Sequence, residues 1–400
     1  MTLRLAAVIA GLFLVLAPAG AATRAPLPVR LAKALDVPYV ASSSEGAAVI
    51  DLTNGDSVFE HNADLSLVPA SNEKLPLTFA ALRELGPGYR FKTELLAAGT
   101  RDGSLWRGSI YLKGFGDPTL TSYGLRRLAR QLASVGIRRV TGGVVGDESW
   151  FDSVRVGPDW KPEFYLTESP PLSALVVNGD AVGTHLALQP ALVAAQLFRR
   201  TLRARGIQTG PATVGTSPAN ATVLATFESA PLPDVIAAMD IDSDNFMAEM
   251  LLKDLGAEVG AAGTTRAGAA VVRKAMAAAG VPMTGVRFLD GSGLSEGDRL
   301  TARAIAVLLK LIWDDPTLRD AVWNALPVAG ESGTLARRLH SPPARGRIRA
   351  KTGTTDLSSA LSGYAGKHYA FALLQNGDPV AWSWAHLAQD RFAQALARGP

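Results

Sequence analysis

The chain has 400 residues, a formal net charge of +4 and no cysteine. This length exceeds the roughly 250–300 residues at which one hydrophobic core stops growing, so two packed units are expected. Hydrophobic residues make up 48% of the chain and charged residues 19%, which excludes an intrinsically disordered protein. The lack of cysteine excludes disulfide frameworks, thiol catalysis and cysteine-based metal sites. No two of the five histidines have helical metal-ligand spacing, and we expect no metal and no cofactor.

The amino terminus has the pattern of a targeting signal. Arg4 precedes an apolar run from Leu5 to Ala17, and small residues follow it. The run is shorter than the roughly 20 residues that span a bilayer. We therefore expect a signal peptide at 1–22, cleaved near Ala21, and an exported protein in the periplasm or another extracytoplasmic space. At most peripheral membrane contact is expected, and an uncleaved anchor is the alternative.

Strands dominate the first part of the remaining chain. Residues 47–61 predict a hairpin that turns at Asn54-Gly55. A helix is expected from about residue 69 to the Gly-Pro-Gly stretch that starts at Gly86. The next stretch predicts a second α/β unit. Its strands are expected at 91–98, 109–114 and 139–146, and its single helix is expected at 122–135.

The second half begins with helices and ends with strands. Alanine-rich helices are expected at 190–205, 231–254, 263–279 and 301–313. Strands with alternating apolar residues are expected at 347–352, 358–365 and 369–374, and a short closing helix is expected at 390–398. This order predicts an α/β (α+β) protein with one antiparallel sheet, built from both chain ends and flanked by helices. The expected main domain comprises 23–87 and 189–400, and a smaller α/β domain is inserted at 88–188.

The positive charge is dispersed along the chain, mostly in isolated arginine pairs. Without interleaved aromatic residues, these pairs predict no nucleic-acid partner. One stretch differs, because Arg345, Arg347, Arg349 and Lys351 alternate with other residues. The side-chain period of a strand is two, so we expect all four on one strand face, where their positive field attracts an anionic ligand.

Three short motifs carry the chemistry. The first joins Ser71 and Lys74, whose i, i+3 spacing on a helix brings a hydroxyl within reach of an amine that can activate it. Alone it is weak, because about one S-x-x-K match is expected by chance in a chain of this length. The second is Ser243-Asp244-Asn245, which suits a proton path and a substrate amide but also a helix N-cap.

The third motif ends the basic stretch. Lys351 and Thr352 can receive a carboxylate, and Gly353 allows a substrate backbone to approach a strand closely; Thr354 completes the motif. Each motif occurs once, and together the three are far more specific than any one of them.

The set S-x-x-K, S-D-N and K-T-G is the one found in penicillin-binding proteins and class A β-lactamases. From about residue 40 onward the chain resembles the D-alanyl-D-alanine carboxypeptidase/endopeptidase family, the dacB-like low-molecular-mass penicillin-binding proteins. Further segments share this resemblance, namely 116–120, 142–147, 171–174, 290–295, 326–330 and 361–364.

The resemblance implies a penicillin-binding-protein/β-lactamase-like transpeptidase domain and a role for each motif. Ser71 would be the acylated nucleophile and Lys74 its general base. Ser243 and Asn245 would relay protons and hold the peptide. The implied substrate is the peptidoglycan stem peptide, and β-lactams would be covalent inhibitors.

The third motif would bind the substrate. Lys351 would keep the site electropositive, while Thr352 and Thr354 would receive the terminal D-alanine carboxylate beside Gly353. The backbone N–H groups of Ser71 and Thr354 would form the oxyanion hole.

Two departures from the family pattern stand out. Pro76 lies two residues after Lys74 and predicts a kink unless the first helical turn absorbs it. The stretch between the first two motifs is short, so the further small domain of larger members should be missing or vestigial. A β-lactamase or esterase on the same fold, and a catalytically silent peptidoglycan-binding protein, are the alternative functions.

Overall fold

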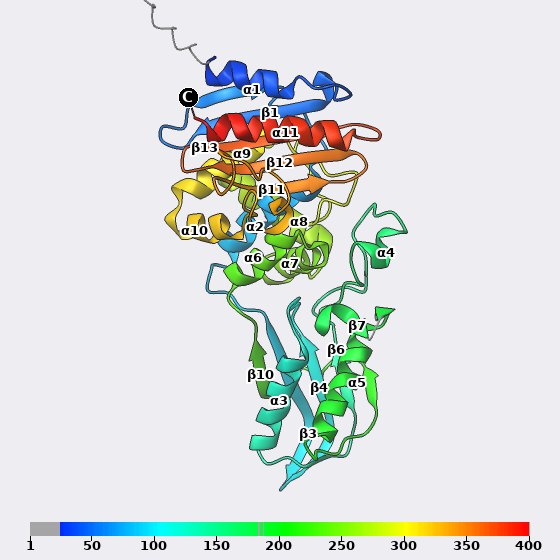
Figure 1. Cartoon of the computed structure of the whole chain (residues 1–400). Helices are drawn as coiled ribbons and strands as arrows, with labels where there is room; N and C mark the ends of the chain where they lie inside the picture. Colours follow the sequence, from blue (N-terminus) through cyan, green and yellow to red (C-terminus); the bar gives the residue numbers. More distant parts are fainter. Residues whose placement is uncertain (1–24, 183–184, 187, 400) are drawn as a thin grey trace, which may run out of the picture.

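The computed structural model of the chain describes residues 25–182, 185–186 and 188–399. The expected signal peptide at 1–22 lies outside these residues. Figure 1 shows a main unit, which contains both ends of the described chain, and an inserted unit that hangs below it.

The main unit is built on a five-stranded sheet in the order β11-β12-β13-β1-β2, with every pairing antiparallel. Its strands are β1 (Glu45–Asp51), β2 (Ser57–His61), β11 (Ile348–Thr354), β12 (Ser358–Ala365) and β13 (Tyr369–Asn376). The first and last parts of the chain therefore meet in one sheet, as the sequence predicts. Because neighbouring side chains on a strand point to opposite faces, Ala47 and Val49 enter one core and Ala48 enters another.

Helices cover both faces of this sheet (Figure 1). Helices α1 (Leu27–Leu35) and α11 (Trp382–Ala397) pack together on one face. The helices on the other face are α2 (Lys74–Glu84), α6 (Leu232–Asp242), α7 (Asn245–Glu258), α8 (Thr265–Ala278), α9 (Ala302–Asp314) and α10 (Pro316–Ala325). Among the helices that the structure describes, none is both long and apolar enough to cross a membrane.

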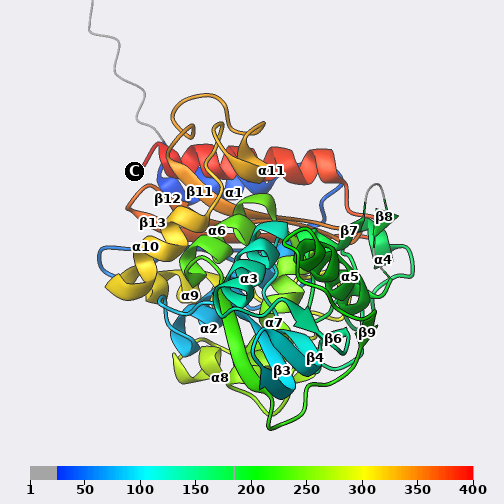
Figure 2. The same cartoon turned by 90° about the horizontal axis from the view of Figure 1, so that it is seen from below.

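The inserted unit has its own six-stranded sheet and its own core. The strands are β3 (Lys92–Asp102), β4 (Leu105–Gly114), β5 (Arg139–Val140), β6 (Val144–Asp147), β9 (Ala212–Val214) and β10 (Thr222–Glu228). Helices α3 (Ser122–Ser134) and α5 (Pro190–Arg203) lie together beside β3, β4 and β6 in Figure 2. The short elements α4 (Phe164–Thr167), β7 (Ala181–Val182) and β8 (His185–Leu186) lie in its long loop.

The second core extends beyond residue 188, where the sequence places the return to the main domain. Helix α5 packs on β6 and β9, and β10 pairs with β3. The buried faces of these elements point into the core of the inserted unit, so the chain returns only after Glu228. Sequence periodicity predicts a helix at 190–205 but does not show which core its apolar face enters.

The helices also differ from expectation in three respects. The stretch 231–254 forms two helices, because Ser243 has a left-handed backbone (φ +59°) that ends α6. The closing helix starts at Trp382 rather than near residue 390. Helices α1 and α10 lie in stretches for which no helix is predicted.

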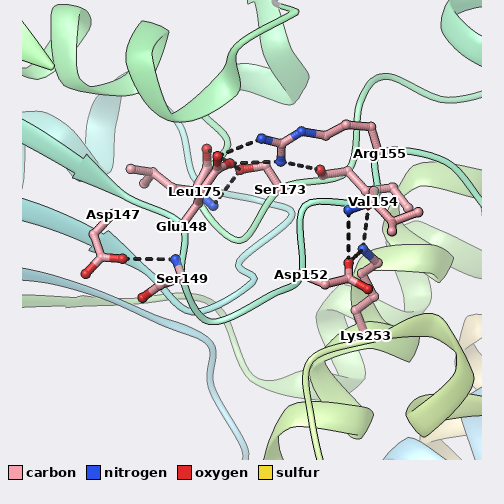
Figure 3. Close-up of polar contacts among 10 residues, drawn as sticks. Asp147, Glu148, Ser149, Asp152, Val154, Arg155, Ser173, Leu175 and Lys253 are labelled. Carbon is pink, nitrogen blue, oxygen red and sulfur yellow. Dashed lines mark hydrogen bonds and ion pairs between the residues drawn. The ribbon is translucent and has the colours of Figure 1, made fainter. Parts of the chain in front are cut away.

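The two units meet along α7, near loops of the inserted unit. Lys253 on α7 is fully buried, and its Nζ donates hydrogen bonds to Asp152 Oδ1 at 2.5 Å and to the Val154 carbonyl at 2.7 Å. Figure 3 shows this contact beside a second network, in which Arg155 forms a bidentate ion pair with Glu148. The Lys253 contacts fix a loop of the inserted unit to the helix that begins with Asn245, and the Arg155–Glu148 pair holds that loop within its own unit.

Candidate active site

Ser71 lies in a 3₁₀ turn (Ala70–Glu73) that leads directly into α2. In a 3₁₀ turn residues three apart are eclipsed, so Ser71 and Lys74 face the same side. Pro76 follows in the first turn of α2, where a backbone N–H has no helical partner, and the helix continues to Glu84. The first turn thus absorbs the proline.

Lys74 is the centre of the site. Its fully buried side chain donates hydrogen bonds from Nζ to Ser71 Oγ at 3.0 Å, to Asn245 Oδ1 at 2.8 Å and to the Ser292 carbonyl at 2.9 Å. The first two motifs therefore meet at one amine. The third acceptor lies in the turn at 290–293, a segment that the sequence relates to the family without assigning it a role.

Ser243 owes its place to the break between α6 and α7. The Asp244 side chain caps α7 by accepting from the Met247 N–H at 2.8 Å, so Asn245 begins the helix. The motif therefore provides the helix cap that the sequence allows, and the Ser243 and Asn245 side chains also line the cavity of the site. The Asn245 Nδ2 also reaches the inserted unit, at 3.3 Å from the carbonyl oxygen and from Oε2 of Glu168.

The third motif lies on β11, the edge strand of the main sheet. Lys351 is fully buried, and its Nζ donates to Ser243 Oγ at 2.7 Å. Thr352 Oγ1 donates to Thr334 Oγ1 at 2.7 Å. A Cβ at Gly353 would lie 2.9 Å from the Pro69 carbonyl oxygen, so glycine is needed here to pack β11 against the turn that carries the nucleophile.

The prediction that four basic residues share one strand face is wrong in part. The strand begins at Ile348, so Arg345 and Arg347 lie in the preceding turn. Arg349 and Lys351 are two residues apart on β11 and so share a strand face, where Arg349 stacks over Trp323 at 4.9 Å and donates to its carbonyl oxygen. Alternation in sequence predicts one face only where the backbone is extended, and here it turns before residue 348.

A cavity of about 300 Å³ joins the motifs. Ser71, Ser243, Asn245, Thr352 and Thr354 line it, as the sequence predicts. Sequence reasoning missed the other lining residues, which are Glu168, Leu294, Thr334, Arg338 and His386. None of the three motifs contains them, although Leu294 belongs to the 290–295 segment that shares the family resemblance. Within the described residues, no cluster of acidic and histidine side chains is arranged to hold a metal ion.

Burial shapes the protonation of both lysines. It lowers the pKa of Lys74 to about 8, although acidic neighbours oppose this effect. The pKa of Lys351 falls to about 7, chiefly because of burial and also because of the nearby Lys74 ammonium. A free amine is therefore accessible near neutral pH, which is what a lysine needs to act as a general base.

These features can be compared with known proteins. The model of the D-Ala-D-Ala carboxypeptidase 3 (S13) family matches residues 27–189 and 186–397. The chain belongs to this family. A D-alanyl-D-alanine carboxypeptidase of Actinomadura sp. (strain R39) is 32% identical over 91% of this chain and 83% of its own.

Solved structures support the fold of this S13 family member. Penicillin binding protein 4 (dacB) from Haemophilus influenzae has a TM-score of 0.79 at 22% identity, over 92% of this chain and 98% of its own. A penicillin G-acylated predatory endopeptidase from Bdellovibrio bacteriovorus, bound to an immunity protein, has a TM-score of 0.57 at 20% identity, over 87% and 90% of the two chains. The fold class predicted from the sequence is confirmed.

Proposed function

We propose that this S13 serine peptidase cleaves peptidoglycan stem peptides through an acyl-enzyme on Ser71 and is acylated there by β-lactams. One contact carries the proposal, the 3.0 Å hydrogen bond between Lys74 Nζ and Ser71 Oγ. A serine hydroxyl is a weak nucleophile until a neighbouring base accepts its proton. The buried Lys74, with its lowered pKa, is such a base.

The reaction follows from these positions. Lys74 accepts the Ser71 proton while Oγ attacks the carbonyl carbon of the penultimate D-alanine, and the peptide C–N bond then breaks. The departing amine takes a proton from the Ser243 hydroxyl, which Lys351 Nζ contacts at 2.7 Å and can resupply. Water next attacks the ester and gives one proton through the Ser243 hydroxyl to Lys351, Ser71 Oγ leaves with the proton that Lys74 carries, and the shortened peptide is released.

The charge distribution of the site suits the substrate. The oxyanion would lie between the Ser71 and Thr354 N–H groups, where one donor is typically worth about 3–4 kcal/mol. Thr352 and Thr354 line the cavity beside the buried Lys351 and would receive the terminal carboxylate. Arg338 also lines this cavity, where its guanidinium is ion-paired with Asp390 at 2.6 Å.

The relatives support the finer parts of the proposal. The Bdellovibrio structure is a penicillin G-acylated endopeptidase, and a second Haemophilus structure is complexed with a β-lactam. We infer that endopeptidase cleavage of cross-links is a second activity of the same site. The substrate lies outside the cytoplasm, so the proposal also includes export by the expected signal peptide.

Covalent labelling tests the function directly. Fluorescent penicillin should label the wild-type protein and Ser134→Ala, a control that removes an exposed hydroxyl from α3, but not Ser71→Ala. Labelling of Ser71→Ala would contradict the assignment. Rapid loss of the adduct with drug hydrolysis would indicate a β-lactamase. A stable adduct without D-alanine release from a pentapeptide would contradict the carboxypeptidase activity.

A further inference from the structure

A buried carboxyl group outside the three motifs faces both lysines of the site. Asp240 lies on α6, three residues before Ser243, and its side chain is fully buried. Its Oδ2 accepts a hydrogen bond from Thr78 Oγ1 at 2.8 Å, while Oδ1 has no hydrogen-bond partner among the described residues. Thr78 lies four residues after Lys74 on α2, so this bond places the carboxyl group on the same helix face as the lysine.

Asp240 interacts electrostatically with Lys351 and with Lys74. Neither ammonium lies within ion-pair distance, so the carboxylate is shared as a charge rather than bound to one amine. Removing charge from water is costly, and a buried site is most stable when its charges cancel. One ammonium balances this one carboxylate. Two ammonium groups would leave an excess positive charge, and two free amines would leave Asp240 uncompensated.

Other acidic groups also face Lys74, from three directions. They are Glu73 beside it, Glu249 and Asp244 on α7, and Asp290 in the turn that follows α8. Burial raises the pKa of Glu73 well above its usual value. It raises the pKa of Glu249 to about 8, so the Glu249 carboxyl group is largely neutral near pH 7.

The remaining two are held by hydrogen bonds of their own. Asp244 caps α7, and Asp290 accepts from the Gly293 and Ser295 N–H groups and from Trp160 Nε1. The pKa of Asp240 rises only to about 6, because Lys351 and Thr78 oppose the effect of burial. Among the described residues, the charged groups that act on Lys351 are Lys74 and Asp240. Asp240 is thus the buried carboxylate that both lysines share.

We propose that Asp240 is a positioning residue that keeps one proton on the Lys74–Lys351 pair. In this state one lysine can serve as the base for Ser71 while the other remains a cation. Asp240 touches neither the nucleophile nor the cavity, so it acts through the lysines alone. The inference rests on the proposed function, because it describes the protonation of the site that would acylate Ser71.

The pH dependence of acylation tests this role. The second-order rate constant for labelling by fluorescent penicillin should be bell-shaped, with limbs that report the two proton losses of the lysine pair. In Asp240→Asn both limbs should move to lower pH by about one unit, because a lost negative neighbour lowers the pKa of an ammonium. A purely structural role would lower the rate at every pH and leave both limbs in place.

Asp254→Asn is the matched control. Asp254 is also buried and hydrogen-bonded on a helix of the main unit, but it is not among the groups that act on either lysine. Both limbs of the pH profile of Asp254→Asn should therefore stay in place. If Asp240→Asn does not fold, the double variant Asp240→Leu/Thr78→Val removes the same charge without leaving an unpaired hydroxyl. It should show the same displacement.

The outcomes separate the two proposals. The role of Asp240 would be overturned if the pH profile of a folded Asp240 variant matched that of the wild type. It would also be overturned if the profile of Asp254→Asn moved by the same amount. A wild-type protein that penicillin does not label at Ser71 would instead overturn the proposed function.

Discussion

The buried Glu249 side chain connects α7 to the turn that contacts Lys74. It lies on α7, and its Oε1 accepts from the N–H groups of Gly291 and Ser292, each at 2.9 Å. The Ser292 carbonyl in turn accepts from Lys74. Burial raises the pKa of Glu249 to about 8, so near pH 6.5 the carboxyl group is neutral and has the shape of an amide.

We therefore expect Glu249→Gln and Glu249→Ala to differ strongly. The glutamine keeps a neutral acceptor and should change the free energy of unfolding at pH 6.5 by less than about 1.5 kcal/mol. The alanine leaves two buried N–H groups without partners, at a cost of about 2–5 kcal/mol, and should also slow penicillin labelling. Denaturant unfolding of both variants checks this, and equal losses in the two would contradict the neutral carboxyl group.

Single residues of the site were predictable where a local motif contains them. The spacing of Ser71 and Lys74 predicts their contact, because three residues make about one helical turn. The sequence does not predict Asp240, Glu249 or Ser292 as neighbours of Lys74. Their positions depend on how α6, α7 and the 290–293 turn pack, and no spacing within one element records that packing.

At the scale of elements, α7 links the site to the inserted unit. Asn245, Glu249 and Lys253 are spaced four residues apart and contact Lys74, the 291–292 backbone and Asp152 in turn. This spacing places all three on one face of the helix. The helix thereby joins the contact between the two units at Lys253 to the Asn245 amide in the site.

Loss of the buried amine at the junction should be costly. Lys253→Met leaves the Val154 carbonyl and Asp152 without their donor (Figure 3), and we expect about 1–3 kcal/mol of destabilisation. Lys310→Met is the control, because Lys310 pairs with the exposed Asp314 on α9 and should contribute less than about 1 kcal/mol. Chemical denaturation of the two variants measures the difference, and similar losses would show that the buried contact contributes little.

Most long elements of the main unit were predictable, but their ends were not. Apolar periodicity predicts β12, β13, α8 and α9. It misses the break at Ser243, because apolar residues continue on both sides of the break. The capping residues Ser243, Asp244 and Asn245 were the signal for a break at this position.

At the scale of the molecule, both chain ends form one sheet around an insertion, as the sequence predicts. The extent of the insertion was not predictable, because β10 pairs with β3 across more than a hundred residues. Alternation of apolar and polar residues predicts a strand but does not show which other strand it pairs with. The two units then meet at buried polar groups rather than at apolar faces alone.

Asp254 is one of these buried groups, and its titration should make stability depend on pH. It accepts from Tyr89 Oη at 2.7 Å, in the segment that leaves the main unit, and from Trp150 Nε1 at 3.1 Å, in the inserted unit. Burial raises its pKa from 3.8 to about 7. Because the folded state binds the proton more tightly, the associated stability is complete below about pH 4 and is lost as the pH rises through 7.

Asp254→Asn cannot ionise, so its stability should not show this loss. Relative to the wild type, the melting temperature of Asp254→Asn should therefore rise steadily between pH 4 and pH 8. Thermal unfolding at several pH values measures the difference, and Asp36→Asn, which removes an exposed carboxyl group after α1, serves as the control. A difference between Asp254→Asn and wild type that is constant with pH would mean that Asp254 is ionised throughout, with its charge stabilised by the Tyr89 and Trp150 donors.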